Sequence, residues 1–298
     1  MKTAAIITPL NNLVFNDLAK ALTMSFMELG WQSMWLGDKD QIRENARGID
    51  LAIVLTPFDY PDINKLLPRA TKVLYQLEAL PWPDRIHLSR RKYWKWDERY
   101  ILMQQYDFVF DHDMGNLRHH YRYYQLQRPC LYFPIGYSPV FELPKKVSQK
   151  NIALFIGSNS EHPQFTHRNR TIRNLSAKLR ERFATVDDRY GDKARQAAMH
   201  AAVCVNIHQN NIKSFEAMRI VGLYMSNGCF VITEPCDDLG PFEHLEHLVV
   251  VPHQDMAAEI SHYLNSEWEI ERIAKNGHEY IKKHYTLTQN LKKVLEQL

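Results

Sequence analysis

Short runs of apolar residues alternate with segments of helical periodicity along the first half of the chain. Such alternation is typical of a parallel α/β sheet, in which a helix connects each buried strand to the next. Leu18, Leu22, Phe26 and Leu29 share one helix face, and Gly30 is a candidate C-cap. The pattern predicts strands over 3–9, 32–36, 50–57, 72–78 and 107–112, and helices over 11–30, 39–47, 89–105 and from Met114 onward.

The second half of the chain repeats the alternation. We expect strands over 151–158, 184–186 and 247–252, and helices over 167–182, 191–201 and 255–265. Its most informative stretch is 203–235, where an apolar strand leads into a loop, a helix carrying Glu216 and Arg219, a Gly-containing turn and a second apolar strand. This crossover leaves its loop at the carboxyl edge of the sheet, where α/β proteins bind ligands. Polar residues at that edge are therefore candidate ligand contacts.

A proline-marked polar segment separates the two halves. We predict a first Rossmann-like domain over 1–138, a linker over 139–150 and a second Rossmann-like domain over 151–280, with 281–298 as a helix that packs back on the first domain. Two α/β sheets facing a central cleft would place a small-molecule site between them.

Composition narrows the class of protein only slightly. Hydrophobic residues make up 45% and charged residues 24% of the 298 positions, as in ordinary globular proteins. The formal net charge is +3, and the apolar run in MKTAAIITPL is too short for a signal peptide or a membrane span. We therefore expect a cytoplasmic protein without a membrane span. The four cysteines lack CxxC spacing, which favours reduced thiols.

Several motifs of the second half resemble those of spore-maturation-type, group 1 glycosyltransferase-like proteins. A strand ends in FIGS (residues 155–158), another ends in VNIH (205–208), and a Phe-Glu-x-x-Arg-like segment contains Phe215, Glu216 and Arg219. A strand of the VITEP type and the tract IAKNGHEYIKKHYT (273–286) follow. The resemblance covers about residues 151–290, and for the first half it is one of architecture.

The resemblance implies a GT-B fold and a nucleotide-diphosphate sugar donor, a UDP-sugar in the first place, with no metal required. The donor-binding residues that it and the sheet-edge argument indicate are Gly157, Ser158, Arg168, His208, Lys213, Ser214, Phe215, Glu216, Arg219 and Glu234. One feature departs from the family. The acid that usually holds the ribose is absent near Gly222 and Leu223, so that contact falls to Glu216 or Glu234.

The chemistry of these residues suits a diphosphate. Arg219 can pair with phosphate oxygens through two N–H groups, and Lys213 can add a point charge. A carboxylate such as Glu216 can accept from adjacent sugar hydroxyls. The alternative for Glu216 and Arg219, three residues apart, is an ion pair on a helix surface.

Catalytic and acceptor residues are expected at the carboxyl ends of the first domain's strands. We assign the catalytic role to Glu78, Asp111 and His112, although an Asp at a strand end is often only a helix N-cap. The sequence favours neither inversion nor retention of the anomeric configuration of the transferred sugar. Acceptor contacts are predicted at Asn11, Asn12, Arg90, Arg91 and Trp94.

Residues 85–128 hold nine Lys and Arg, five Asp and Glu, four His and ten aromatic residues. Basic residues among aromatics suit nucleic acid, so hydroxymethylated DNA, as in phage-type enzymes, is one candidate acceptor and a polysaccharide is another. Tyr93, Trp96 and Tyr100 also have the spacing of a buried helix stripe. One alternative function is a non-catalytic nucleotide-sugar or nucleic-acid binding protein with the same fold. An NAD(P)-dependent enzyme is less favoured, because no GxGxxG motif follows the first strand.

Overall fold

The computed structural model of the protein describes residues 1–12, 14–77, 100–122, 125–144, 150–158, 160–161, 165–187, 190–209 and 213–298. These residues form two compact units. The first unit contains Met1–Pro134 and Leu287–Leu298, and the second contains Ile135–Thr286.

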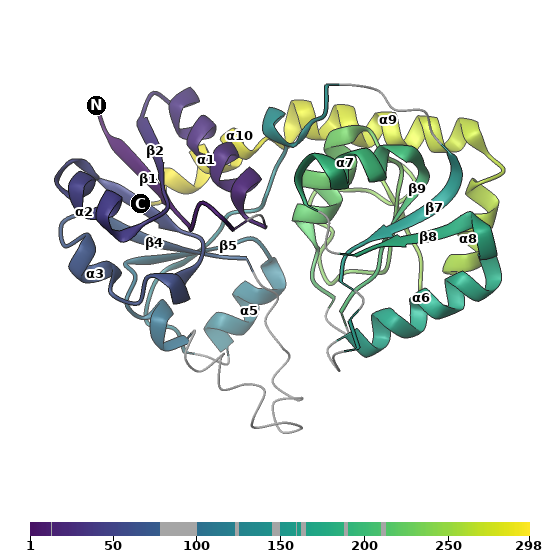
Figure 1. The fold of residues 1–298 in the computed structure, drawn as a ribbon, viewed down its shortest axis with the longest axis horizontal. Coiled ribbons are helices and arrows are strands. Elements are labelled where there is room, and N and C mark those ends of the chain that lie inside the picture. Colours follow the sequence, from purple (N-terminus) through teal and green to yellow (C-terminus); the bar gives the residue numbers. More distant parts are fainter. Residues whose placement is uncertain are drawn as a thin grey trace. The chain divides into compact units, whose positions relative to one another are not determined.

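The first unit is built on a parallel sheet with the strand order β2-β1-β3-β4-β5-β6 (Figure 1). Its strands are β1 (Thr3–Ile7), β2 (Gln32–Leu36), β3 (Leu51–Val54), β4 (Thr71–Gln76), β5 (Phe108–Asp111) and β6 (Cys130–Tyr132). Every residue of β1 and β3 is buried, as expected for strands covered on both faces. Because the strands are parallel, their carboxyl ends all meet at one edge of the sheet. Asp111, the last residue of β5, and His112, which follows it, lie at this edge.

The described helices of this unit are α1 (Asn16–Glu28), α2 (Lys39–Asn45), α3 (Ile63–Leu66), α5 (Met114–Arg122) and α10 (Leu287–Leu295). Short 3₁₀ turns occupy Ala46–Gly48 and Pro57–Asp59. Gly30 follows α1 in the left-handed region with a φ of +81°, and its N–H donates to Met27 at 3.0 Å. A residue with a side chain would be strained at this φ, which explains why the helix ends at a glycine.

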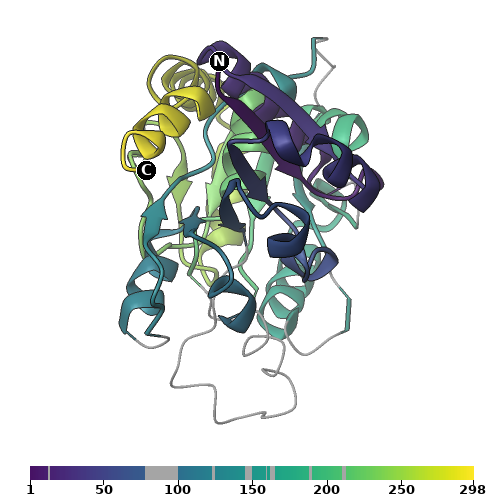
Figure 2. The same ribbon diagram turned by 90° about the vertical axis from the view of Figure 1, so that its left-hand side faces the viewer.

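The carboxyl-terminal helix α10 belongs to the first unit and contacts α1 (Figures 1 and 2). The Thr288 hydroxyl lies 2.6 Å from Glu28 and 3.0 Å from Ser25, and Asn290 donates to the carbonyl of Pro134 at 3.1 Å. Leu287, Leu291 and Val294 are fully buried. The helix therefore contributes apolar surface to the unit as well as these hydrogen bonds.

The second unit contains a parallel sheet with the order β11-β10-β9-β7-β8. Its strands are β7 (Lys150–Ile156), β8 (Phe183–Val186), β9 (Ala201–Asn206), β10 (Val231–Thr233) and β11 (Val249–Val250). Its helices are α6 (Thr166–Leu179), α7 (Gly191–His200), α8 (Met256–Tyr263) and α9 (Glu267–His284). Short 3₁₀ turns lie at Pro139–Phe141, Arg180–Arg182 and Met225–Asn227.

A core of strand and helix residues holds the second unit together. Phe155, Val205 and Ile232 from the sheet pack in one cluster with Leu175 of α6 and Ile260 of α8. Helices α6 and α8 contact each other, while α7 contacts β7 and β9 (Figure 1). This packing fixes the carboxyl ends of β7, β9 and β10 relative to one another.

Two elements differ from the sequence prediction. Residues 207–209 and 213–216 are irregular, and Met218–Tyr224 then forms a π-helical segment. Glu216 thus precedes the helix, and its carbonyl accepts the N–H groups of Arg219 and Ile220. The strand expected over 247–252 is reduced to Val249–Val250, and Pro252, which has no N–H to donate, follows it. Most of the helix predicted over 89–105 lies outside the described residues.

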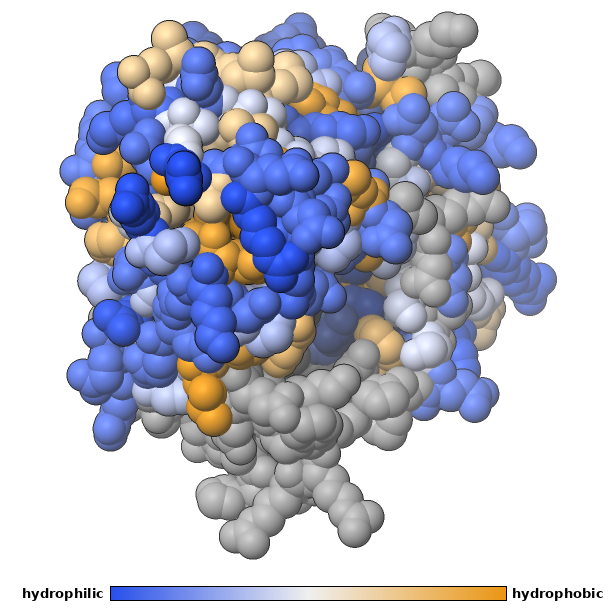
Figure 3. Space-filling view, turned by 60° about the vertical axis from the view of Figure 1, so that its left-hand side comes forward, coloured by the Kyte–Doolittle hydropathy of each residue, from blue (hydrophilic) through white to orange (hydrophobic). Residues whose placement is uncertain are grey.

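The face of the molecule drawn in Figure 3 is mostly hydrophilic, with apolar residues in small separate groups. Among the described residues, we find no helix with the length and apolar character needed to cross a bilayer.

Candidate functional site

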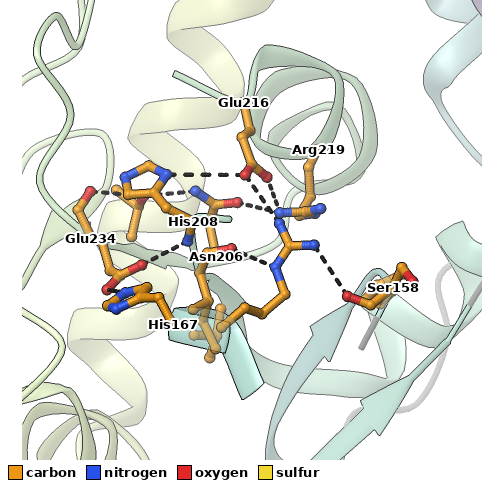
Figure 4. A network of polar contacts seen from close by, with 12 residues as sticks. Ser158, His167, Asn206, His208, Glu216, Arg219 and Glu234 are labelled. Carbon is orange, nitrogen blue, oxygen red and sulfur yellow. Dashed lines mark hydrogen bonds and ion pairs between the residues drawn. The ribbon is translucent and has the colours of Figure 1, made fainter. Parts of the chain in front are cut away.

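The carboxyl edge of the second sheet gathers polar residues from β7, β9, β10, α6 and the π-helical segment (Figure 4). Arg168, near the start of α6, lies at the centre and is only 1% exposed. Its Nε donates to the carbonyl of Ile207 at 3.1 Å, Nη1 donates to that of Ser158 at 3.1 Å, and Nη2 lies 3.3 Å from Glu216. One guanidinium therefore joins the ends of β7 and β9 to Glu216.

Arg168 remains charged despite its burial. Burial, joined by the neighbouring charge of Arg219 and opposed by that of Glu216, lowers its pKa to about 10. A buried cation of this kind requires a nearby anion and full use of its N–H groups. Glu216 supplies that anion, so the two residues depend on each other.

Arg219 is the second cation of the site. It forms an ion pair with Glu216 through Nη1, and the same nitrogen donates to Asn206 Oδ1 at 2.7 Å. Its side chain is 17% exposed, compared with 2% for Arg168. Arg219 and Glu216 thus form an ion pair, which was the alternative to ligand binding in the sequence analysis. Unlike a simple pair on a helix surface, Glu216 also contacts the buried Arg168, and the pair lies at the edge of the sheet.

Gly157 and Phe155 explain how two guanidinium groups fit side by side. The Phe155 ring lies 5.3 Å from the guanidinium carbon of Arg168 and 5.1 Å from that of Arg219, both within cation–π range. Gly157 has a φ of +153°, and a Cβ there would come within 2.9 Å of Arg219 Nη2. The glycine of FIGS is therefore required by the backbone and by the position of Arg219.

His208 follows β9 and is 4% exposed. Its backbone N–H donates to Glu234 at 2.6 Å, and its Nε2 lies 3.3 Å from the carbonyl of Pro235. Among the described residues, its Nδ1 has no hydrogen-bond partner, although it lies 4.0 Å from Glu216. A buried imidazole nitrogen without a partner is costly, so this atom is available for a ligand.

Glu234 directly follows β10 and is held from two sides. His167 Nε2 lies 2.7 Å from Oε1, and the His208 N–H occupies Oε2 (Figure 4). Burial alone would raise the pKa of Glu234, but the His167 hydrogen bond and the charge of His208 outweigh it and lower the pKa below its ordinary value. His253 Nδ1 lies 3.9 Å from the same Oε1 atom.

Three predicted donor residues lie away from this network. Lys213 is exposed, and its carbonyl accepts the N–H of Asp237 at 2.9 Å. Ser214 and Phe215 are buried, and the Phe215 ring stacks on Phe242 at a centroid distance of 5.5 Å. Phe215 therefore anchors the loop to the core, whereas Lys213 points to solvent.

In the first unit, Asp111 is fully buried at the end of β5. Its Oδ1 accepts the Asp113 N–H at 2.9 Å and the Asn116 amide at 3.1 Å, and lies 3.5 Å from His112 Nδ1. Burial alone would lower the pKa of His112, but its hydrogen bond to Asp111 and the charges of Asp111 and Asp113 raise it above the ordinary value. Asp113, whose Oδ1 accepts the Asn116 N–H at 2.9 Å, is the N-cap of α5.

The remaining predicted residues fall in two groups. Asn11 is exposed, and Asn12 forms a turn in which its N–H donates to Pro9 at 3.0 Å. A second group lies outside the described residues and comprises Glu78, Arg90, Arg91 and Trp94.

Sequence reasoning missed Asn206, His167 and His253. Asn206 also donates to Thr233 at 3.0 Å and thereby links the ends of β9 and β10. His253 follows β11 and could have been found by extending the sheet-edge rule to that strand. His167 lies on α6, and no feature of its local sequence distinguishes it from a surface residue.

Comparison with solved structures identifies the fold. The chain matches Anabaena HepE in complex with UDP and glucose, with a TM-score of 0.67, 11% identity and complete coverage of both chains. It matches T4 phage BGT in complex with UDP and Mn²⁺ with a TM-score of 0.62, 10% identity and coverage of 100% of this chain and 99% of that one. An α-glucosyltransferase in complex with UDP and a 13-mer DNA containing an HMU base matches with a TM-score of 0.61, 11% identity and coverage of 99% and 98%.

The chain therefore has the GT-B fold of glycosyltransferases, and the predicted α/β architecture of two Rossmann-like units is confirmed. Its residues 158–296 match the family described as glycosyl transferase-like, which confirms the resemblance found in the second half. No curated protein matches the chain.

Proposed function

We propose that the chain is a glycosyltransferase that binds a nucleotide-diphosphate sugar, a UDP-sugar in the first place, and transfers the sugar to a hydroxyl group. The observation that carries this proposal is the Arg168–Glu216–Arg219 cluster at the carboxyl ends of β7 and β9. In α/β proteins this edge is where nucleotides bind, and a phosphate group requires cations and N–H donors. The UDP complexes of structures with the same fold support the choice of nucleotide.

The two arginines have different proposed roles. All three nitrogens of Arg168 already have partners within the protein, so we assign it the positioning of Ser158, Ile207 and Glu216. Arg219 is more exposed, and its Nη2 lies next to Gly157, where a diphosphate could approach the backbone closely. Arg219 therefore stabilises the charge that develops on the leaving diphosphate, and this stabilisation requires no metal.

His208 and Glu216 complete the donor site. Because Nε2 of His208 faces the carbonyl of Pro235, the neutral ring carries its proton there, and Nδ1 can accept a hydrogen bond from a ribose or sugar hydroxyl, which would satisfy an otherwise unpartnered atom. Glu216 is the better candidate for hydroxyl groups of the ribose or sugar, because its side chain is 22% exposed and that of Glu234 only 5%. Exposed Lys213 can add charge from the loop.

The catalytic base is proposed in the first unit. Asp111 is fully buried and accepts hydrogen bonds within its own loop. His112 faces Asp111 and Gln76 with Nδ1, and its second ring nitrogen, Nε2, is the one that would take up a proton. This favours His112 as the base that removes the proton of the acceptor hydroxyl and Asp111 as the carboxylate that orients it. Glu78 remains a second proposed base.

For the acceptor we propose hydroxymethylated DNA. The basic and aromatic composition of residues 85–128 supports an anionic partner, and one structure of the same fold is a complex with DNA containing an HMU base. Acceptor contacts would come from Arg90, Arg91 and Trp94, with Asn11 and Asn12 near the end of β1.

The donor site is tested by titrating the protein with UDP, GDP and uridine in a calorimeter. We expect UDP to bind, and Arg219→Lys, which keeps the charge but loses the forked geometry, to weaken binding about 10- to 100-fold. Arg173→Met, an exposed arginine on α6, is the control and should leave the Kd of UDP unchanged. Donor hydrolysis or transfer by the wild type would then separate an enzyme from a binding protein. A wild type that binds no nucleoside diphosphate would remove the donor assignment.

A further inference from the structure

Two histidines and one carboxylate converge beside the donor residues. His167 comes from the first turn of α6, Glu234 directly follows β10, and His253 comes from the segment after β11. One ligand atom from each lies within 4.8 Å of the other two. No other such trio of His, Cys, Asp or Glu occurs among the residues that the structure describes.

Hydrogen bonding accounts for only part of this arrangement. Oε2 of Glu234 accepts from the His208 backbone, and Oε1 faces His167 at 2.7 Å. His253 Nδ1 is directed at the same Oε1 from 3.9 Å, which is too long for a hydrogen bond. The two imidazole rings also contact each other edge to face, with centroids 4.9 Å apart.

We propose that His167, Glu234 and His253 form a binding site for a divalent transition-metal ion of the Zn²⁺ class. Two histidine nitrogens and one carboxylate oxygen are a known ligand set for zinc, with water in the fourth position. Bonds of about 2.0–2.1 Å would place the ligand atoms a little over 3 Å apart. His253 Nδ1 therefore has to approach Glu234 Oε1 by less than one ångström, and His167 Nε2 has to move slightly away from it.

The surroundings suit such a site. The side chain of Glu234 is only 5% exposed, so its carboxylate is already held in place. The backbone N–H of His208 binds Oε2, the carboxylate oxygen that would not contact the ion, and so orients the ligand. His253 is 49% exposed, which gives the ion a route from solvent. A bound ion would cross-link α6, β10 and the segment after β11, and thereby stabilise the edge that carries His208.

The test uses protein without a polyhistidine tag, freed of metal by chelation and titrated with Co²⁺ and with Zn²⁺. We expect one Co²⁺ per chain with visible ligand-field absorption, displaced by Zn²⁺, and a higher Tm in the presence of Zn²⁺. His253→Ala should weaken Zn²⁺ binding at least about 10-fold and abolish the absorption. Because His253 is half-exposed, this variant should fold, and its Tm without metal verifies that.

The matched control is His262→Ala. His262 also pairs with a carboxylate, Glu269, at 3.2 Å and is 57% exposed. Among the described residues, however, no third potential ligand joins this pair. Its replacement should leave Co²⁺ and Zn²⁺ binding unchanged. Equal binding by the wild type and His253→Ala, or an equal loss in His262→Ala, would overturn the proposal. UDP binding by metal-free protein is measured separately, so failure here is distinguishable from failure of the donor site.

Discussion

Gly157, in the FIGS sequence that ends the first strand of the second unit, lies against the side chain of Arg219. A side chain there would meet the Arg219 guanidinium at 2.9 Å and the Phe155 ring at 3.0 Å, in a backbone conformation with a φ of +153°. The glycine in the FIGS sequence thus allows Arg219 to lie directly over the backbone. Its loss should therefore change ligand binding as well as stability.

We expect Gly157→Ala to lower the free energy of unfolding by about 1–3 kcal/mol through backbone strain, and also to displace Arg219 and weaken UDP binding. Gly191→Ala is the control, because Gly191 also has a positive φ, +62°, but nothing lies within 4 Å of an added Cβ. That variant should cost about 1–2 kcal/mol and leave the Kd of UDP unchanged. Thermal unfolding and UDP titration measure the two effects. Equal UDP affinity in both variants would contradict the coupling.

His112 gives a prediction of pH dependence. As a base it must be deprotonated, so the rate of transfer should rise with pH through its pKa, which Asp111 and Asp113 hold above the ordinary value of 6.5. Asp111→Asn keeps an acceptor oxygen but removes a negative charge, and should shift the acid limb of the kcat/KM profile to lower pH. His112→Asn should abolish that limb. A profile that neither variant changes would assign the base elsewhere, to Glu78 first.

At the scale of elements, the sequence was sufficient for the parallel α/β architecture. Short apolar runs such as DLAIVLTP, rich in β-branched residues, are typical of strands covered on both faces, and Gly30 and Pro252 lie just beyond α1 and β11. The π-helical segment over Met218–Tyr224 was not predictable, because a π-helix has no distinct periodicity signal in a single turn. Glu216 therefore appeared to lie within a helix, although it precedes one.

The candidate site was only partly predictable for a related reason. Position after a strand identified His208, Glu216 and Glu234, since the carboxyl ends of parallel strands meet. It could not show that Arg168 is buried with all its nitrogens occupied, or that Phe215 packs on Phe242. These roles depend on side-chain direction after loops, and a loop's sequence does not determine that direction.

At the scale of the whole molecule, charge is modest but unevenly distributed. The net charge of +3 provides little general attraction for nucleic acid, whereas residues 85–128 concentrate nine basic side chains. Any binding to DNA should therefore depend on this segment and decrease steeply with salt.

We expect duplex DNA containing hydroxymethylated bases to bind with an affinity that falls as salt increases, because phosphate contacts release counterions. Replacing both Arg90 and Arg91 by Gln should reduce the slope of log K against log salt by about 2. Lys275→Gln and Lys283→Gln, exposed on α9, are the control pair and should leave the slope unchanged. An affinity indifferent to salt would exclude DNA and favour a polysaccharide acceptor.

The place of α10 has a consequence for how the protein is made. Thr288 contacts Ser25 across 263 positions of sequence, so the first unit is not complete until the ribosome has translated residues 287–298. The residues between Pro134 and Leu287 take roughly 8–30 s to translate at 5–20 residues per second. During that interval the surface of α1 that α10 later covers faces solvent or a chaperone. The part of the chain that emerges first is thus among the last to reach its final packing.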